Sequence, residues 1–241
     1  MLRLVRPSLF VALGLAVILT AVLMSGMWQS SSAAPSAAIA AEVGVAPVGR
    51  NAVEFVGIVD QDGLNFSYYG YLTYIAGITD TLLFTDPISR TEATARFTFY
   101  GAANMTGRAI VDNLFNLNAS GVITYYFDET QGADFDDPSS FTRGIAIASA
   151  TTRFQNVLVV ISPDRGIANG VAELTQTSTT PFELAGQSHQ LGRNLMQQRF
   201  TYSGFGTRLE PTIPRAEIVI AANGEVTGLP SLLPLIEAGA P

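Results

Sequence analysis

The sequence predicts an all-β protein, an antiparallel β-barrel of about eight to ten strands, with a two-sheet β-sandwich as the alternative. Short runs that alternate apolar and polar residues recur along the chain, turn residues separate them, and no stretch has a convincing amphipathic helical pattern. We favour the barrel because the connections are short and sequential strands tend to pair with one another.

The clearest hairpin lies between residues 145 and 179. Ile145 to Ile161 is a long run rich in β-branched residues without glycine or proline. Ser162 to Gly166 (SPDRG) then supplies proline, aspartate and glycine, each of which favours a turn. Ile167 to Thr179 returns as a second β-type run, and a hairpin this long needs a larger sheet to lie in.

Two further runs alternate with a period of two residues. The inward face of the first is predicted to hold Leu64, Phe66, Tyr68, Leu72 and Tyr74, and that of the second Ala93, Ala95, Phe97 and Phe99. A turn signal at Asn118 to Gly121 predicts a hairpin between the runs that flank it. Gly204 and Gly206 predict a bulge or bend inside the strand around them.

The chain divides into four predicted parts. Residues 1–40 read as a signal peptide or an uncleaved membrane anchor, 41–52 as a flexible linker, 53–226 as a single antiparallel β domain and 227–241 as a proline-containing tail. Arg3 and Arg6 precede an apolar run at residues 9–28, which is followed by small residues. We expect an extracytoplasmic location, secreted if the segment is cleaved and anchored by residues 9–28 if it is not.

Composition excludes several kinds of chemistry. The chain has a net charge of −7, no cysteine, one histidine and no lysine, so its thirteen basic residues are all arginine. An acidic chain does not favour nucleic acid, and we expect membrane contact only through the N-terminal segment. Schiff-base chemistry, thiol nucleophiles, disulfides and multi-histidine metal sites are absent. The bias towards alanine and arginine suggests a bacterial source.

Two sets of residues are candidates for a site. Aromatic and arginine side chains could hold a small ligand if they line a barrel cavity: Tyr68, Tyr69, Tyr71, Arg96, Tyr100, Arg153 and Arg199. The longest polar loop has the oxygen density that calcium prefers, which makes Asp128, Asp134, Asp136 and Asp137 the candidate metal ligands. No other cofactor is expected.

These observations favour an exported, non-catalytic β domain that binds a small apolar molecule or a component of the cell envelope. One alternative is a secreted enzyme of the cyclase, isomerase or glycosidase type that uses carboxylates or tyrosine, for which Glu54, Glu92 and Glu173 are the acids to locate. The other is a structural cell-surface protein. His189, the one histidine, is expected to lie on the surface or to be structural.

Overall fold

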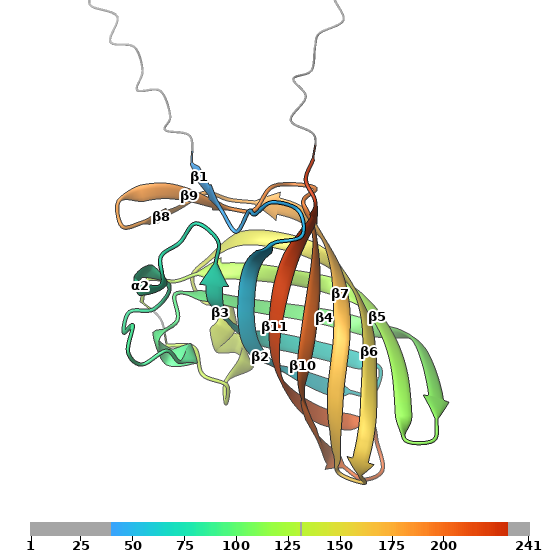
Figure 1. Ribbon diagram of the computed structural model, residues 1–241. Helices are drawn as coiled ribbons and strands as arrows, with labels where there is room; N and C mark the ends of the chain where they lie inside the picture. Colours follow the sequence, from blue (N-terminus) through green and yellow to red (C-terminus); the bar gives the residue numbers. More distant parts are fainter. Residues whose placement is uncertain (1–39, 131, 231–241) are drawn as a thin grey trace, which may run out of the picture. The chain divides into compact units, whose positions relative to one another are not determined.

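The computed structural model describes residues 40–130 and 132–230, which form a closed antiparallel barrel of eight strands (Figure 1). The barrel strands are β2 (Asn51–Asp62), β3 (Asn65–Ile75), β4 (Phe97–Val111), β5 (Leu114–Phe127), β6 (Ile145–Ser162), β7 (Arg165–Thr179), β10 (Gln197–Glu210) and β11 (Arg215–Gly228). Each pairs with its neighbour in this order, and β11 pairs with β2 to close the ring. The predicted barrel is therefore confirmed.

A three-stranded sheet lies at one end of the barrel (Figure 1). It consists of β1 (Ala41–Val43), β9 (Gln187–Leu191) and β8 (Phe182–Leu184). The Gln176 side chain of β7 donates a hydrogen bond of 2.8 Å to the Leu191 carbonyl, which ties this sheet to the barrel. The stretch 41–52, expected to be a flexible linker, thus contributes β1 and the start of β2, and its Val43 and Ala52 are buried.

The remaining elements are short helices: α2 (Asp80–Leu83), η1 (Glu92–Thr94) and η2 (Pro138–Thr142). In residues 40–130 and 132–230, no helix has the length and apolar character needed to cross a bilayer. The predicted signal or anchor segment lies outside the described residues, as does most of the predicted C-terminal tail.

The two ends of the barrel differ in their connections. Four connections of two to four residues join β2 to β3, β4 to β5, β6 to β7, and β10 to β11, and antiparallel order places all four at one end. The connections 76–96, 128–144 and 180–196 lie at the opposite end, together with β1, β8 and β9. Long segments are therefore available to cover one end only. We call the end with the short turns the mouth.

One predicted turn was wrong, and one predicted bulge is not found. The hairpin expected at Asn118 to Gly121 lies instead at Asp112 and Asn113, where Asp112 adopts a left-handed φ of 52°. Gly121 lies within β5, and β4 passes so close to it that an added Cβ would lie 2.0 Å from the Ala102 carbonyl oxygen. The register is also regular from Gly204 to Gly206, and the irregularities of β10 fall near its two ends. The hairpin of β6 and β7 forms as predicted.

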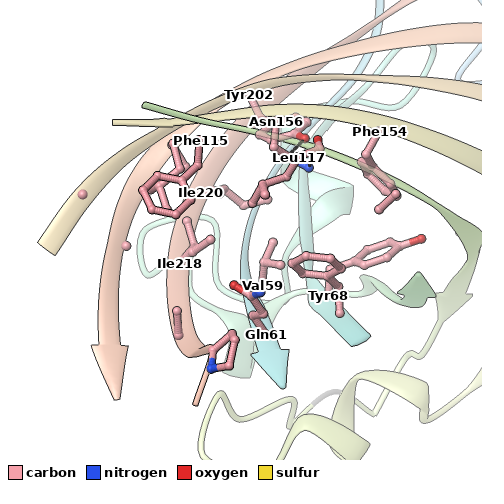
Figure 2. Close-up of a pocket in the computed structure, with 18 of the residues that line it drawn as sticks. Val59, Gln61, Tyr68, Phe115, Leu117, Phe154, Asn156, Tyr202, Ile218 and Ile220 are labelled. Carbon is pink, nitrogen blue, oxygen red and sulfur yellow. Dashed lines mark hydrogen bonds between the residues drawn. The ribbon is translucent and has the colours of Figure 1, made fainter. Parts of the chain in front are cut away.

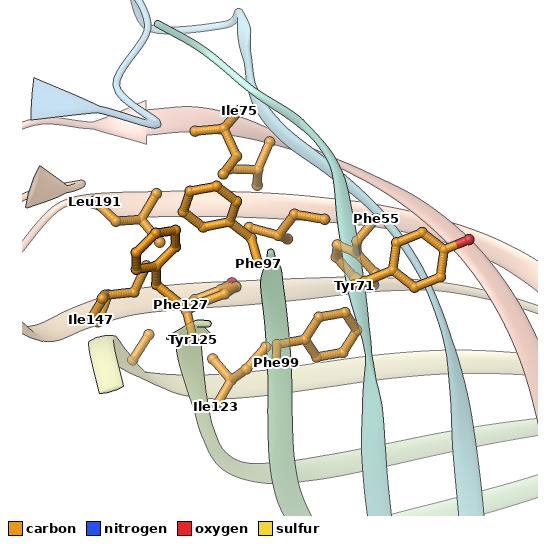
Figure 3. Close-up of a cluster of buried hydrophobic side chains, with 14 of the residues drawn as sticks. Phe55, Tyr71, Ile75, Phe97, Phe99, Ile123, Tyr125, Phe127, Ile147 and Leu191 are labelled. Atoms are coloured by element: carbon orange, nitrogen blue, oxygen red, sulfur yellow. The ribbon is translucent and has the colours of Figure 1, made fainter. Parts of the chain in front are cut away.

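The barrel interior is hollow towards the mouth (Figure 2) and packed towards the other end (Figure 3). The packed half is built largely from aromatic rings on neighbouring strands. Phe97 lies 5.1 Å from Phe127 and 5.6 Å from Phe182 of β8, measured between ring centroids, so the small sheet contributes to the same core. Leu72, Ile75 and Ile147 are fully buried there.

The predicted inward faces are largely confirmed. Phe66, Tyr68 and Leu72 of β3 are buried in this interior, as are Ala95, Phe97 and Phe99. Leu64 is exposed, because it lies in the turn before β3. Tyr74 is half-buried opposite Glu54, because an irregularity in the β2–β3 register puts Ile75 rather than Tyr74 into the core. Ala93 belongs to η1 and is exposed.

Gly101 of β4 makes room for the ring of Tyr68. The two residues are opposite one another in the β3–β4 pair, and a Cβ added to Gly101 would lie 2.2 Å from the Tyr68 ring. Gly170 lies opposite Tyr202 in the β7–β10 pair, and a Cβ added to Gly170 would lie 2.3 Å from the Tyr202 ring. Glycine is required at both positions because tyrosine rings lie flat across the backbone there.

Replacing Gly101 with alanine is expected to lower the free energy of unfolding by about 1–3 kcal/mol, because the tyrosine ring has no free space to move into. Urea denaturation of the variant measures this loss. Gly107→Ala in the same strand is the control, since its added Cβ would meet the nearest atom at an ordinary 3.6 Å. In a Tyr68→Ala background the cost of Gly101→Ala should disappear; the same cost with and without the ring would contradict this packing argument.

Candidate functional site

The hollow half of the barrel is a cavity of about 650 Å³. Its wall is mainly apolar and draws side chains from all eight barrel strands, among them Val59, Phe115, Leu158, Ala168, Ile218 and Ile220. Several of these point into one common space in Figure 2. The cavity opens at the mouth, where turn residues such as Asn113, Pro163 and Pro214 line it. Its volume falls within the range typical of sites for small organic ligands, about 300–1,000 Å³.

Tyr68 is the main polar group on one side of the cavity. Its hydroxyl donates to the Val122 carbonyl oxygen at 2.6 Å and lies 3.1 Å from the Thr152 hydroxyl. Burial raises the pKa of Tyr68, and the Thr152 contact only partly offsets that effect. The ring of Phe154 packs edge-on against Tyr68 with 5.2 Å between centroids. This hydroxyl is therefore neutral and already paired.

A second polar pair lies across the cavity wall. The Tyr202 hydroxyl of β10 donates to the side-chain oxygen of Asn156 on β6. The Asn156 amide in turn donates to the Leu117 carbonyl oxygen at 3.5 Å. Burial also raises the pKa of Tyr202. The deep wall thus presents polar groups that bond to one another, which leaves an essentially apolar surface for a ligand.

The mouth has a different character. Four arginines and two aspartates line it: Arg108, Arg165, Arg208, Arg215, Asp112 and Asp164. Apolar side chains at the surrounding hairpin tips are exposed, including Val111, Leu114, Ile161 and Ile213. The Asp164 carboxylate accepts a hydrogen bond from Ser162 at 2.7 Å, and this bond, with the Asp164 backbone and nearby Arg165, lowers its pKa.

The structure places one of the predicted ligand residues in the cavity. Tyr68 lines it, whereas Tyr69, Tyr71 and Tyr100 lie on the outside of the barrel wall. Tyr69 is buried there beneath Phe135 and Phe141, and its hydroxyl donates to Asp60 at 2.8 Å. These outer tyrosines therefore hold the loop between β5 and β6 against the barrel, a structural role.

The predicted arginines also lie outside the cavity. Arg153, Glu173, Arg199 and Glu225 are neighbours across four successive strands on the outer face. In this row Arg153 forms an ion pair with Glu173 at 3.3 Å. Arg96 lies just before β4, where its backbone bonds to Leu83 and Asp128. These arginines were expected to bind a ligand only if their faces lined a cavity, and they do not line it.

Three of the four aspartates of the predicted calcium site cap local turns, and the fourth, Asp136, donates its backbone N–H to one of them. The Asp128 carboxylate accepts from Thr130, Asp134 accepts from the Asp136 backbone, and Asp137 accepts from Ser139. Asp137 also pairs with Arg143 at 3.6 Å. Among the described residues, no three acidic or histidine side chains lie close enough together to hold a metal ion.

The acids named for an enzyme do not line the cavity either. Glu54 and Glu173 belong to outward positions of β2 and β7, and Glu92 lies in η1. His189 is buried in the small sheet, where its ring packs 5.8 Å from that of Phe182. The acids that line the cavity are Asp112 and Asp164, and both lie in turns at the mouth.

Sequence reasoning missed most of the cavity wall. Phe154, Asn156 and Leu158 lie on the inward face of β6, in the run that anchored the fold prediction. Their spacing of two residues is visible in the sequence, but β-branched residues on both faces of the run conceal which face is inward. Arg108 was missed because its inward direction depends on a bulge that the sequence does not signal.

Tyr125 gives a test of the buried interior that depends on pH. It is fully buried, its hydroxyl has no hydrogen-bond partner among the described residues, and burial raises its pKa above the ordinary 10.0. At pH values between the ordinary pKa and the raised one, the Tyr125 hydroxyl loses its proton in the unfolded chain and keeps it in the folded chain. Stability should therefore fall as the pH rises above about 10.

Tyr125→Phe is expected to make this alkaline loss less steep. At neutral pH the variant should be as stable as the wild type or more stable by about 1 kcal/mol, because an unpaired buried hydroxyl is removed. Urea midpoints measured from pH 8 to pH 11 test both points. A variant with the wild-type pH slope would show that Tyr125 is not in the apolar interior.

Comparisons with models of protein families, with curated proteins and with solved structures gave no match. The fold and the site therefore define the class by themselves. The chain is an eight-stranded antiparallel barrel with an apolar cavity that opens at one end.

Proposed function

We propose that this protein is an exported, non-catalytic barrel that binds one small apolar molecule in its cavity. The observation that carries the proposal is the apolar cavity of about 650 Å³ in the half of the barrel nearest the mouth. Transfer of the apolar surface of a ligand from water into such an interior is favourable. The order of basic, apolar and small residues at the N-terminus supports export.

The shape of the barrel supports access for such a ligand. The mouth is framed by turns of two to four residues, and apolar side chains such as Leu114 and Ile161 are exposed at the same end of the barrel. Turns of this length leave the opening uncovered, so a ligand can enter there. The deep wall offers paired tyrosines and no carboxylate, which favours binding over acid–base chemistry on a substrate.

The test is the binding of a neutral fluorescent probe, N-phenyl-1-naphthylamine, to the delipidated protein. The wild type is expected to bind it saturably at one molecule per chain. Ala168→Phe should weaken binding at least about tenfold, because Ala168 lines the cavity and a ring at this position would occupy part of its volume.

Ala102→Phe is the matched control, because Ala102 is exposed and belongs to the outward-facing residues of β4. It should bind the probe as the wild type does. Both variants should keep the cooperative unfolding of the wild type. Equal affinity for wild type and Ala168→Phe, or no saturable binding by the wild type, would refute the proposed function.

A further inference from the structure

The four arginines at the mouth make this region unlike the rest of an acidic chain. The chain carries a net charge of −7, yet arginines outnumber acids in the cavity lining by four to two. None of the four forms an ion pair with any described residue, whereas Arg90, Arg143, Arg153 and Arg193 all do. Arg215 lies opposite Asp62 and Glu210 in the sheet, and Arg165 lies near Asp164, so Arg108 and Arg208 are the two mouth arginines with no acid opposite them in the described strands.

Arg108 faces the cavity because of a bulge in β4. Even-numbered residues earlier in the strand, such as Ala102, face outward. Thr106 is an extra residue without a partner in β5, so the alternation reverses after it and Arg108 lies opposite Leu117, a cavity-lining residue. A bulge that re-aims a side chain is common next to binding sites. Without it, Arg108 would point to the outside.

Arg208 is held at the same mouth by the β10–β11 turn. Its Nε donates to the Glu210 carbonyl oxygen at 2.8 Å, and its Nη2 donates to the Pro211 carbonyl oxygen at 2.7 Å. A guanidinium has five N–H donors, so these two bonds fix its direction and leave others for a ligand. Arg208 lies opposite Ala216, another cavity-lining residue.

The deep part of the cavity has no comparable charged side chain among its lining residues. The hydroxyls of Tyr68 and Tyr202 are bonded to protein partners, and the surrounding wall is aromatic and aliphatic. A charged ligand group placed there would lose its hydration without gaining a counterion. A ligand that carries both an apolar chain and a charge therefore fits in one direction, with its chain inward and its charge at the mouth.

We infer that the ligand is a long-chain carboxylate, with the hydrocarbon chain along the apolar wall and the carboxylate at the mouth beside Arg108, while Arg208, four strands away in the ring, adds positive charge on the opposite wall. This inference rests on the proposed function and names its ligand class. The planar fork of a guanidinium matches the two oxygens of a carboxylate, which gives paired, charge-assisted hydrogen bonds. The two aspartates lie in the turns, and Asp164 is engaged by Ser162, so the arginines remain the groups that meet the head group.

The experiment compares dodecanoate with dodecanol as competitors of N-phenyl-1-naphthylamine on the delipidated protein. The two compounds share their hydrocarbon chain and differ in charge. The wild type should bind dodecanoate more tightly than dodecanol. Arg108→Gln should weaken dodecanoate binding about three- to tenfold and leave dodecanol binding unchanged, because a single exposed guanidinium contributes modestly.

Arg199→Gln is the matched control, because Arg199 lies on the outer face between Glu173 and Glu225. It should not alter the binding of either compound. If both compounds bind equally well to the wild type, or if Arg108→Gln affects them equally, the carboxylate inference is wrong while the apolar-ligand proposal stands. If neither compound nor the probe binds, the proposed function itself fails.

Discussion

The pairing of β11 with β2 closes the sheet, and the interior exists only because that pairing is complete. It runs from Arg215 opposite Asp62 to Glu225 opposite Asn51, so it extends over most of both strands. A closed sheet has no free edge, and eight strands enclose a space that side chains either fill or leave for one small ligand. Which of these outcomes occurs at each level of the barrel depends on the size of the inward residues.

Inward residues change in size along the barrel axis. Phenylalanine dominates the end near β8 and β9, where Phe97, Phe99 and Phe127 meet. Towards the mouth the inward positions include many small residues: Ala103, Ala119, Gly166, Ala168, Ala172, Gly206 and Ala216. The hollow half is thus a direct consequence of sequence. The long connections and the small sheet begin at the packed end, whereas turns of two to four residues frame the other end.

Much of the fold could be predicted because strand alternation is a local property. The hairpin of residues 145–179 and the inward direction of Phe97 and Phe99 follow from β propensity, turn residues and period-two spacing. The turn at Asp112 could not be told from the competing signal at Asn118 to Gly121, since both offer asparagine beside residues that tolerate turns. That choice depends on cross-strand packing, which a single segment does not reveal.

The candidate site was harder to predict than the fold. Alternation separates Tyr68 from Tyr69, but it does not show that a distant loop buries Tyr69 on the outer face. Nor does it show that Arg153 and Arg199 belong to an outer row of charges while Arg108 turns inward after a bulge. These outcomes depend on contacts between segments far apart in the sequence, so residue type alone did not indicate which arginines face the cavity.

The most direct test of this account is a xenon titration of the protein with labelled isoleucine, leucine and valine methyl groups, followed by NMR. Xenon binds in apolar cavities and needs no specific hydrogen bond. The methyl resonances of Leu158 and Ile218 should shift with saturation, whereas those of Ile75 and Ile147 in the packed half should not. Shifts of similar size in both groups, or none at Leu158 and Ile218, would contradict a barrel that is packed at one end and hollow at the other.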